Sequence, residues 1–257
     1  MSTVQRLELL RPRDLNALIG DSFNAYRAHF LAFLAIGAAV VIPVELVVSG
    51  IGLGQLTGHY SSKTRAGEQV VNAAEIYLLI GPLVTAMVIH ALLTVADGER
   101  PRPGAAIVSG MEAFRSVFFA VLLAAAGVVG GLFLLIVPGV YLFVIWAFVP
   151  QAVVLDGRRG GAALRRSAEL VQGSWWRVLG LLLITGLVLA IPAAMIAFPA
   201  EALAKSADRQ VIALAGQAAA STLITPLQTM ILTLLYFDLL ARHQLPATVP
   251  PVPPPPA

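Results

Sequence analysis

The chain has no cysteine and few charged residues, and each of these two features excludes a class of protein. Without cysteine there can be no disulfide scaffold, no thiolate nucleophile and no Cys-based zinc site. Charged residues make up only 12% of the 257 residues, whereas soluble domains carry roughly 25%. Since 58% of the residues are hydrophobic, the charges are too few to cover a water-facing surface. We therefore expect lipid to be the solvent for much of the chain.

Six long apolar segments predict six membrane-spanning helices. They are expected at about residues 30–53, 69–96, 117–137, 139–155, 178–198 and 211–240. About 20 apolar residues in a helix cross the ~30 Å hydrocarbon core of a bilayer. The sequence thus predicts an all-α, polytopic membrane protein with a single domain over residues 1–244. The proline-rich tail, 245–257, is expected to be disordered.

Three amphipathic segments precede pairs of these spans, starting near residues 14, 104 and 161. The first has Asp14 as its expected N-cap. We expect these segments to be interfacial helices on the cytoplasmic side. For the first, packing against protein remains the alternative. Between the third and fourth spans, Pro138 and Gly139 are expected to reverse the chain, and Gly81 with Pro82 to kink the second span.

The distribution of Lys and Arg predicts the orientation of the spans. With six spans and a cytoplasmic N-terminus, 13 of the 17 Lys and Arg residues lie in inside segments, and the exceptions are Lys63, Arg65, Lys205 and Arg209. An excess of cations marks the cytoplasmic side. We therefore expect a multi-pass protein of the bacterial inner membrane with both termini in the cytoplasm.

Three stretches of sequence carry a resemblance to a known family: DLNALIGDSFNAYRAHF from Asp14, ALRRSAELVQGSWWRVLG from Ala163, and TPLQTMILTLLYFDLLAR from Thr225. Together they resemble the glycerophosphodiester-phosphodiesterase membrane-domain-like proteins, a group of six-helix bacterial inner-membrane proteins. The resemblance implies the same six-helix architecture. In some relatives this domain is joined to a soluble phosphodiesterase barrel, so the family name alone does not imply a hydrolase activity for these helices.

A few polar residues inside the apolar segments are candidates for an intramembrane site. Glu45 and Glu75 are expected in the outer half of the membrane, where they could form a proton- or cation-linked site or could reach the outer water. His90 is either part of such a site or bonded to a neighbouring helix. The last span carries a polar face that could line a pathway or bond between helices, formed by Thr222, Thr225 and Thr229.

The basic and aromatic residues at the predicted membrane boundary are candidate contacts for anionic lipid headgroups. They are Arg27, Arg158, Arg159, Arg165, Arg166, Trp175, Trp176 and Arg177. Gly127 and Gly131 form a GxxxG pattern that favours close helix packing, either within the bundle or in a homo-oligomer.

No enzyme signature is found, since the sequence has no HExxH, no phosphate loop and no Gly-x-Ser-x-Gly elbow. No cofactor and no nucleic-acid partner are expected, because the cations follow the membrane boundary. Two functional hypotheses remain. The first is a non-enzymatic membrane protein that binds lipid or a protein partner and supports envelope homeostasis. The second is a small transporter or channel-like protein that uses Glu45, Glu75 and the threonine face.

Overall fold

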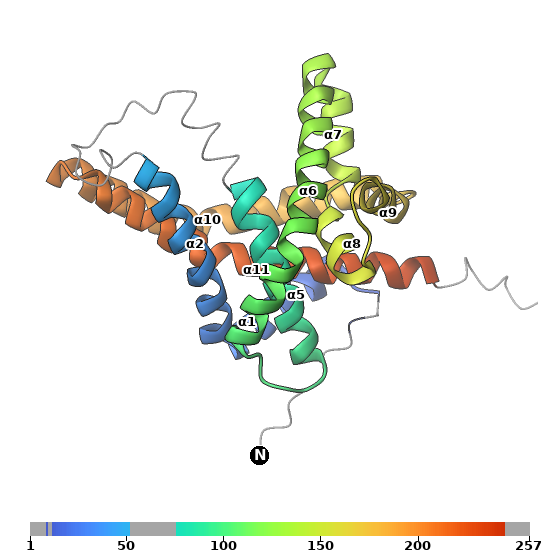
Figure 1. The fold of residues 1–257 in the computed structure, drawn as a ribbon, viewed down its shortest axis with the longest axis horizontal. Coiled ribbons are helices and arrows are strands. Elements are labelled where there is room, and N and C mark those ends of the chain that lie inside the picture. Colours follow the sequence, from blue (N-terminus) through green and yellow to red (C-terminus); the bar gives the residue numbers. More distant parts are fainter. Residues whose placement is uncertain (1–8, 10–11, 52–75, 245–257) are drawn as a thin grey trace, which may run out of the picture.

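The computed structural model describes residues 9, 12–51 and 76–244, and these ranges contain helices and no β-strand. The predicted loop at 54–68, Glu75 and the proline-rich tail lie outside them. The helices are α1 (Leu15–Ala28), α2 (Phe30–Ile51), the π-helix η1 (Ile76–Ile80), α5 (Gly81–Ala96), α6 (Pro103–Leu134), α7 (Ile136–Ile145), α8 (Val149–Asp156), α9 (Gly161–Val171), α10 (Trp175–Ala207) and α11 (Gln210–Gln244) (Figure 1).

Several of these helices have the length and apolar character of membrane spans. Five described segments qualify: Leu78–Ala96, Pro103–Leu134, Ile136–Asp156, Trp175–Ala207 and Gln210–His243. A sixth is obtained if α1 and α2, which are bent by 88° relative to each other, are counted as one broken span. The described chain is therefore all-helical, as predicted, and compatible with a multi-pass membrane protein.

Helix α1 begins and ends where its local sequence dictates. The Asp14 carboxylate caps it by accepting a hydrogen bond from the Ala17 N–H over 2.9 Å. At its other end the chain bends at His29 into α2. Leu18 and Tyr26, from the face predicted to meet lipid, are buried in the protein core. The Tyr26 hydroxyl also donates to the Leu223 carbonyl of α11 over 3.0 Å, which favours the protein-packing alternative for this part of the face.

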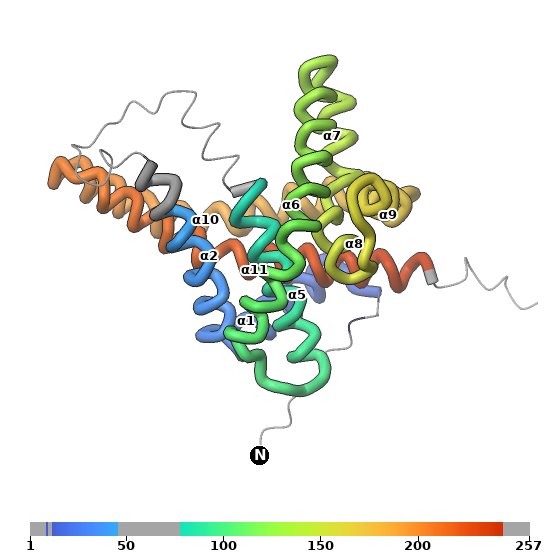
Figure 2. Tube along the Cα trace, in the orientation of Figure 1, coloured from blue at the N-terminus to red at the C-terminus, as the bar shows by residue number. Residues whose placement is uncertain are grey.

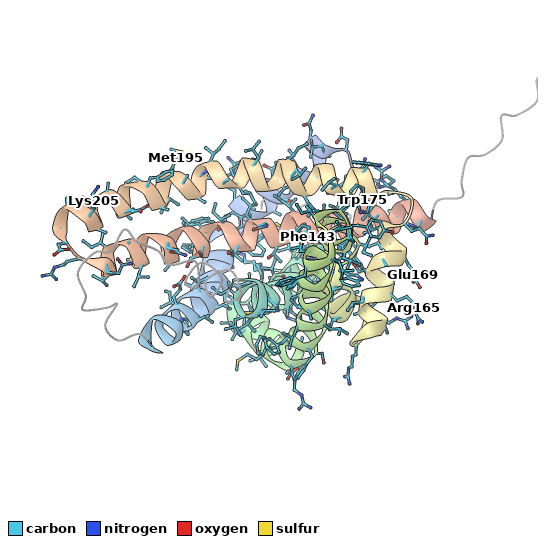
Figure 3. The ribbon with its side chains drawn as sticks, turned by 90° about the horizontal axis from the view of Figure 1, so that it is seen from above. Phe143, Arg165, Glu169, Trp175, Met195 and Lys205 are labelled. Atoms are coloured by element: carbon cyan, nitrogen blue, oxygen red, sulfur yellow. The ribbon has the colours of Figure 1, made fainter. Side chains whose placement is uncertain are left out.

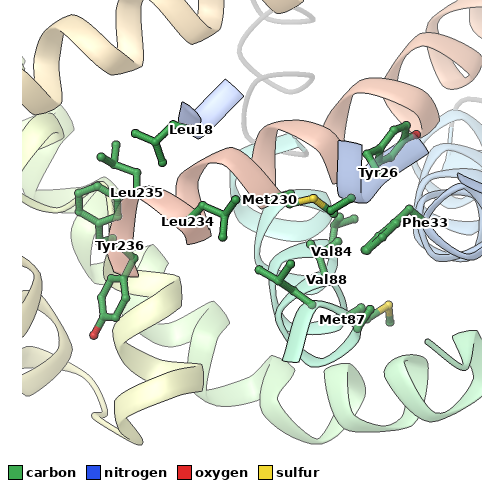
Figure 4. Packing of buried hydrophobic residues seen from close by; sticks show 14 of the residues in the cluster. Leu18, Tyr26, Phe33, Val84, Met87, Val88, Met230, Leu234, Leu235 and Tyr236 are labelled. Atoms are coloured by element: carbon green, nitrogen blue, oxygen red, sulfur yellow. The ribbon is translucent and has the colours of Figure 1, made fainter. Parts of the chain in front are cut away.

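Helix α11 forms the centre of the fold, because α1, α2, α5, α9 and α10 all pack against it. The path of the chain around it can be followed in Figure 2. Its side chains Met230, Leu234 and Tyr236 are fully buried, and they meet Phe33 from α2 and Leu18 from α1 in one core cluster (Figure 4). A central helix surrounded on most sides explains why this span carries polar threonines without placing them in lipid.

Two glycine contacts bring helices close together. A Cβ added at Gly37 of α2 would collide with the Thr222 carbonyl oxygen of α11 and lie 3.0 Å from the ring of Pro226. Pro226 has no N–H, so the Thr222 carbonyl lacks its usual partner within the helix. The backbone of Gly37 covers this carbonyl, at the close range that permits a weak Cα–H···O contact.

The glycines of the GxxxG pattern pack within the chain. A Cβ at Gly127 would collide with the indole ring of Trp146, and one at Gly131 would lie 3.1 Å from the Cα of Gly139. Both contacts join α6 to the segment that follows the turn. The small residues therefore allow close packing inside the bundle, which was the first of the two alternatives.

The region between residues 98 and 156 differs from the sequence prediction in two ways. The amphipathic segment near 104 is not a separate helix but the first part of α6, because no breaker interrupts residues 105–134. The reversal lies at Leu135, in extended conformation with φ −163° and ψ 151°, and not at Pro138 and Gly139. Pro138 sits in the first turn of α7, where a missing N–H is tolerated.

The predicted fourth span is interrupted by a short turn, although Ile136–Asp156 remains one candidate membrane span. Its chain forms α7 and α8 with a non-helical segment, Trp146–Phe148, between them. Conversely, the fifth and sixth helices are longer than predicted, with 33 residues in α10 and 35 in α11. The three turn residues Trp146–Phe148 thus shorten the helix that pairs with α6.

The two long helical hairpins of the structure run in different directions. Helices α10 and α11 lie side by side along the longest axis of the molecule, whereas α6 and α7 project away from them (Figure 1). In the view from above, α10 and α11 are seen lengthwise and α6 and α7 nearly end-on (Figure 3). One face of α10 is exposed and apolar, formed by Leu183, Leu187, Ile191, Met195 and Phe198.

Candidate functional site

A buried carboxylate, Asp238 near the end of α11, accepts hydrogen bonds from two distant parts of the chain and from its own helix. Its side chain is 0% exposed. It accepts a hydrogen bond from the main-chain N–H of Arg13 over 2.6 Å, one from Arg177 over 3.1 Å, and a pair from Nε of Arg242 over 3.0 and 3.1 Å. A buried charge is tolerated when it is paired and hydrogen-bonded in this way.

The carbonyl oxygen of Arg13 completes this Asp238 cluster. It accepts hydrogen bonds from Arg177 over 2.7 Å and from Arg242 over 2.9 Å. The Arg13 side chain pairs with Asp21 of α1 over 3.0 Å. The cluster thus fastens the segment before α1 to the start of α10 and the end of α11.

This cluster changes the role predicted for Arg177. The sequence places Arg177 among the contacts to lipid headgroups, but its guanidinium donates to Asp238 and to the Arg13 carbonyl. Asp238 and Arg242 stand four residues apart on α11 and form a salt bridge of 3.0 Å. The other partners were missed, although one signal was available: an acid inside the apolar run LLYFDLLA must find cations from elsewhere in the chain.

A second polar contact joins α8 to α9. Nε of Arg166 donates to Asp156 over 2.5 Å, with both side chains partly buried. The hydrogen bond with Asp156 raises the pKa of Arg166 above its ordinary value. The hydroxyl of the buried Tyr236 faces this pair without a hydrogen bond of ordinary geometry to either residue. Arg166 therefore points inward, unlike its neighbour Arg165, which is 75% exposed.

A cleft lies where α7, α9 and the start of α10 meet. Its volume is about 300 Å³, and its lining includes Tyr141, Arg165, Glu169 and Trp175. The rings of Tyr141 and Trp175 are stacked, with centroids 6.0 Å apart. Trp176 stands edge-on to Trp175 at 4.7 Å. An aromatic wall beside a cation is the arrangement expected where an amphipathic surface meets lipid headgroups.

The charged residues of this cleft are accessible to solvent. Arg165 and Glu169 form a salt bridge of 3.7 Å between side chains that are 75% and 54% exposed, and both lie on the outer side of α9 (Figure 3). An exposed pair of this length contributes little to stability. Its charges are therefore free to meet a polar ligand. The indole Nε1 of Trp175 is buried without a hydrogen-bond partner in the described chain.

The other predicted headgroup contacts remain at the surface. Arg27, Arg158, Arg159 and Trp176 are exposed. Arg158 and Arg159 lie between α8 and α9, in the connection before the cleft helix α9. Positive φ at Gly157 and Gly160 shapes this short connection.

The candidate intramembrane residues are placed in different surroundings. Glu45 is half-buried near the end of α2, and His90 is half-buried in α5. Thr222 and Thr229 are buried in α11, while Thr225 is half-buried. A second cleft lies beside the first at the start of α10 and is lined by residues 173–177. None of the candidate intramembrane residues lines either of these two clefts. Glu75 lies outside the described residues, so its position relative to Glu45 stays a prediction.

Within the described ranges, no group of three or more His, Asp or Glu residues is arranged to hold a metal ion. The polar groups gathered at the cleft and the Asp238 cluster are guanidinium groups, carboxylates and aromatic rings. These groups can bind and position an ionic ligand.

The fold and these polar sites define a class of protein: an all-helical bundle with several helices able to cross a membrane and ionic contacts between the helix ends. More specifically, the chain belongs to the family described as Domain of unknown function (DUF7847), which matches residues 36–239. The matched region includes the cleft, Asp156 and Asp238. No curated protein and no solved structure matches this chain.

Proposed function

We propose that this protein is a non-enzymatic, multi-pass protein of the bacterial inner membrane that binds anionic lipid headgroups and supports envelope homeostasis. The observation that carries this proposal is the cleft of about 300 Å³ lined by Tyr141, Trp175 and Arg165. Stacked aromatic rings supply an amphipathic wall, and a cation near the membrane surface attracts anionic lipid by ~1 kcal/mol.

The topology that we propose has both termini in the cytoplasm. It rests on the excess of Lys and Arg in the segments assigned to that side. The six apolar segments lie in the membrane, and α1 and α9 lie at its cytoplasmic surface. The resemblance to the glycerophosphodiester-phosphodiesterase membrane-domain-like proteins supports the same arrangement, and we propose it as a distant relationship without hydrolase activity.

The transporter hypothesis has less support. It needs a continuous polar passage that joins Glu45 to the threonine face of α11. The two clefts described lie at the other polar region of the molecule, beside α9 and the start of α10. The buried threonines are accounted for by contacts such as the hydrogen bond from Thr233 to the Thr229 carbonyl over 2.8 Å. We also place Gly127 and Gly131 against α7 and assign no oligomer to them.

Lipid selection measured by native mass spectrometry tests this proposal. The full chain is reconstituted with equal amounts of phosphatidylglycerol and phosphatidylcholine, and the lipids retained on the protein are counted. We expect phosphatidylglycerol to be retained preferentially. The substitution Arg165→Gln should lower this preference about fivefold, the factor that ~1 kcal/mol represents. Trp175→Leu should lower the retention of both lipids, because it removes part of the aromatic wall without changing the charge.

Arg209→Gln is the matched control, because Arg209 is an equally exposed cation at the opposite end of α10. Its removal changes the net charge by the same amount without touching the cleft. The proposal fails if Arg165→Gln and Arg209→Gln lower the preference equally, since the effect would then be one of net charge alone.

A further inference from the structure

The hairpin of α6 and α7 contains a long stretch without any charge. From Ser116 to Leu155 the sequence has no Asp, Glu, Lys, Arg or His. Charged residues flank this stretch at Arg115 and Asp156. A segment of this composition is stable only in protein or in lipid.

The tip of this hairpin is entirely apolar and uncovered by protein. Its five residues, Phe133 to Val137, are each between 69% and 88% exposed. The turn itself is made by Leu135, the single non-helical residue between α6 and α7. A hairpin that emerges from the far side of a membrane would place these five side chains in water, which is unfavourable by about 1.5–3 kcal/mol for each large apolar side chain that could otherwise be buried.

The contacts of α7 with α9 and α10 set the depth that the tip can reach. Tyr141 of α7 lines the same cleft as Arg165 and Glu169, whose side chains are mostly exposed to water. The level of Tyr141 is therefore close to the polar boundary. Leu135 lies six residues before Tyr141, which is a rise of ~9 Å along a helix. The tip thus lies ~9 Å beyond the level of Tyr141, which is less than the ~30 Å thickness of the hydrocarbon core.

The hairpin of α10 and α11 differs in its turn, although its helices are about as long as α6, which has 32 residues. These helices have 33 and 35 residues, enough for ~50 Å each. Their turn carries the exposed charged residues Lys205, Asp208 and Arg209. The two hairpins also run in different directions (Figures 1 and 3), so both cannot cross one bilayer along its normal. The charged turn identifies α10 and α11 as the pair that crosses, because a crossing hairpin has to place its turn in water.

We propose that the α6–α7 hairpin enters the membrane from the cytoplasmic side and ends inside it, with the tip Phe133–Val137 in contact with acyl chains. The hairpin is then an anchor in one leaflet and does not form the third and fourth spans. This inference rests on the membrane placement proposed above. The hairpin enters and leaves the membrane on the same side, so the number of membrane crossings stays even. Both termini therefore remain in the cytoplasm.

Cysteine labelling tests the hairpin directly, since the natural chain has no cysteine. Three single variants of the full chain are made: Leu135→Cys at the tip, Ser206→Cys near the turn after α10, and Arg158→Cys on the cytoplasmic side. Each is treated with a membrane-impermeant sulfonated maleimide in right-side-out and in inverted membrane vesicles. We expect Ser206→Cys to react only in right-side-out vesicles, Arg158→Cys only in inverted ones, and Leu135→Cys in neither.

A spin label at the same positions provides the second measurement. At position 135 collisions with oxygen should exceed collisions with a water-soluble nickel complex, and at position 206 the order should reverse. Labelling of Leu135→Cys from either side overturns the inference, because the tip would then be in water. If the variants at 206 and 158 lack opposite sidedness, the proposed topology itself fails. If they keep it while position 135 labels from outside, only the hairpin inference fails.

Discussion

The main-chain N–H of Arg13 donates to the carboxylate of Asp238 over 2.6 Å, although the two residues are 225 positions apart in the chain. This bond joins the first described segment to the last helix. Because Asp238 is fully buried and also paired with Arg177 and Arg242, the carboxylate holds three chain segments in register. Removing its charge should affect all three together.

Asp238→Asn should destabilise the protein substantially. Arg177 and Arg242 would lose a charged partner, and breaking a fully buried pair costs about 3–5 kcal/mol. We expect about 2–3 kcal/mol here, because both arginines are roughly one-third exposed and solvent screens them. The Tm of the protein in detergent should fall by about 5–10 °C. Asp97→Asn, at an exposed acid after α5, is the control and should leave the Tm within 2 °C of wild type, by the rule that exposed sites contribute about 0.5 kcal/mol or less.

Arg165 and Arg166 are adjacent, yet their removal should have different effects on stability. Arg166→Gln removes the bond to Asp156 and leaves a partly buried carboxylate without its cation, which we expect to cost about 1–2 kcal/mol. Arg165→Gln removes only an exposed contact of 3.7 Å and should cost less than about 0.5 kcal/mol. Both changes remove one positive charge from the same helix. Equal losses in a thermal unfolding experiment would contradict the inward placement of Arg166.

Gly37→Ala should weaken the packing of α2 on α11. The new Cβ would collide with the Thr222 carbonyl oxygen, which is backbone and cannot move without shifting the helix. Overpacking of this kind costs about 1–3 kcal/mol. Gly20→Ala provides the matched control in α1, because nothing lies within 4 Å of a Cβ at that site. It should leave the Tm unchanged or raise it, since Ala favours a helix over Gly by up to about 1 kcal/mol.

The pKa of His29 should lie below its ordinary value of 6.5, because burial and the nearby Arg100 both disfavour the charged imidazole. The folded state then binds a proton less readily than the unfolded state. The contribution of neutral His29 to stability is therefore complete above pH 6.5 and is lost as the pH falls through the lower, folded pKa. NMR titration of the labelled imidazole would measure this value, with the signal assigned through the His29→Asn variant.

Arg100→Gln separates the two causes of the His29 shift. It should raise the pKa of His29 part of the way towards 6.5, because burial remains. Arg102→Gln removes a neighbouring exposed charge and should leave the pKa of His29 in place. A pKa at or above 6.5 in the unsubstituted protein would contradict the burial of His29 beside Arg100.

Local features of the fold could be predicted from the sequence, whereas contacts between distant segments could not. The cap at Asp14 depends on three residues of chain, and the structure confirms it. The all-helical membrane class follows from composition. The turn at Leu135 was misplaced because a proline and a glycine usually mark a turn, but a proline also fits the first turn of a helix. Residues 132–135 are all apolar and include no residue typical of a turn, so the sequence did not indicate a turn there.

The candidate site shows the same division. The cleft contains Arg165 and Trp175, which the boundary pattern of cations and aromatic rings had identified. The partner Tyr141 was missed, because it lies in an apolar run whose approach to α10 depends on the break at Trp146–Phe148. Arg177 was assigned to lipid because its sequence neighbours are two tryptophans. Its actual partner, Asp238, lies 61 positions further along the chain.

The contact of Gly37 with Thr222 and Pro226 has an evolutionary consequence. Both Gly37 and Pro226 fall inside the region that defines the family. A proline at 226 leaves a carbonyl that only a residue without a side chain can approach, so substitutions at the two positions are not independent. Relatives that replace the proline gain an N–H for that carbonyl, so the close approach of α2 at position 37 is no longer needed to cover it. The two positions should therefore covary among members of the family.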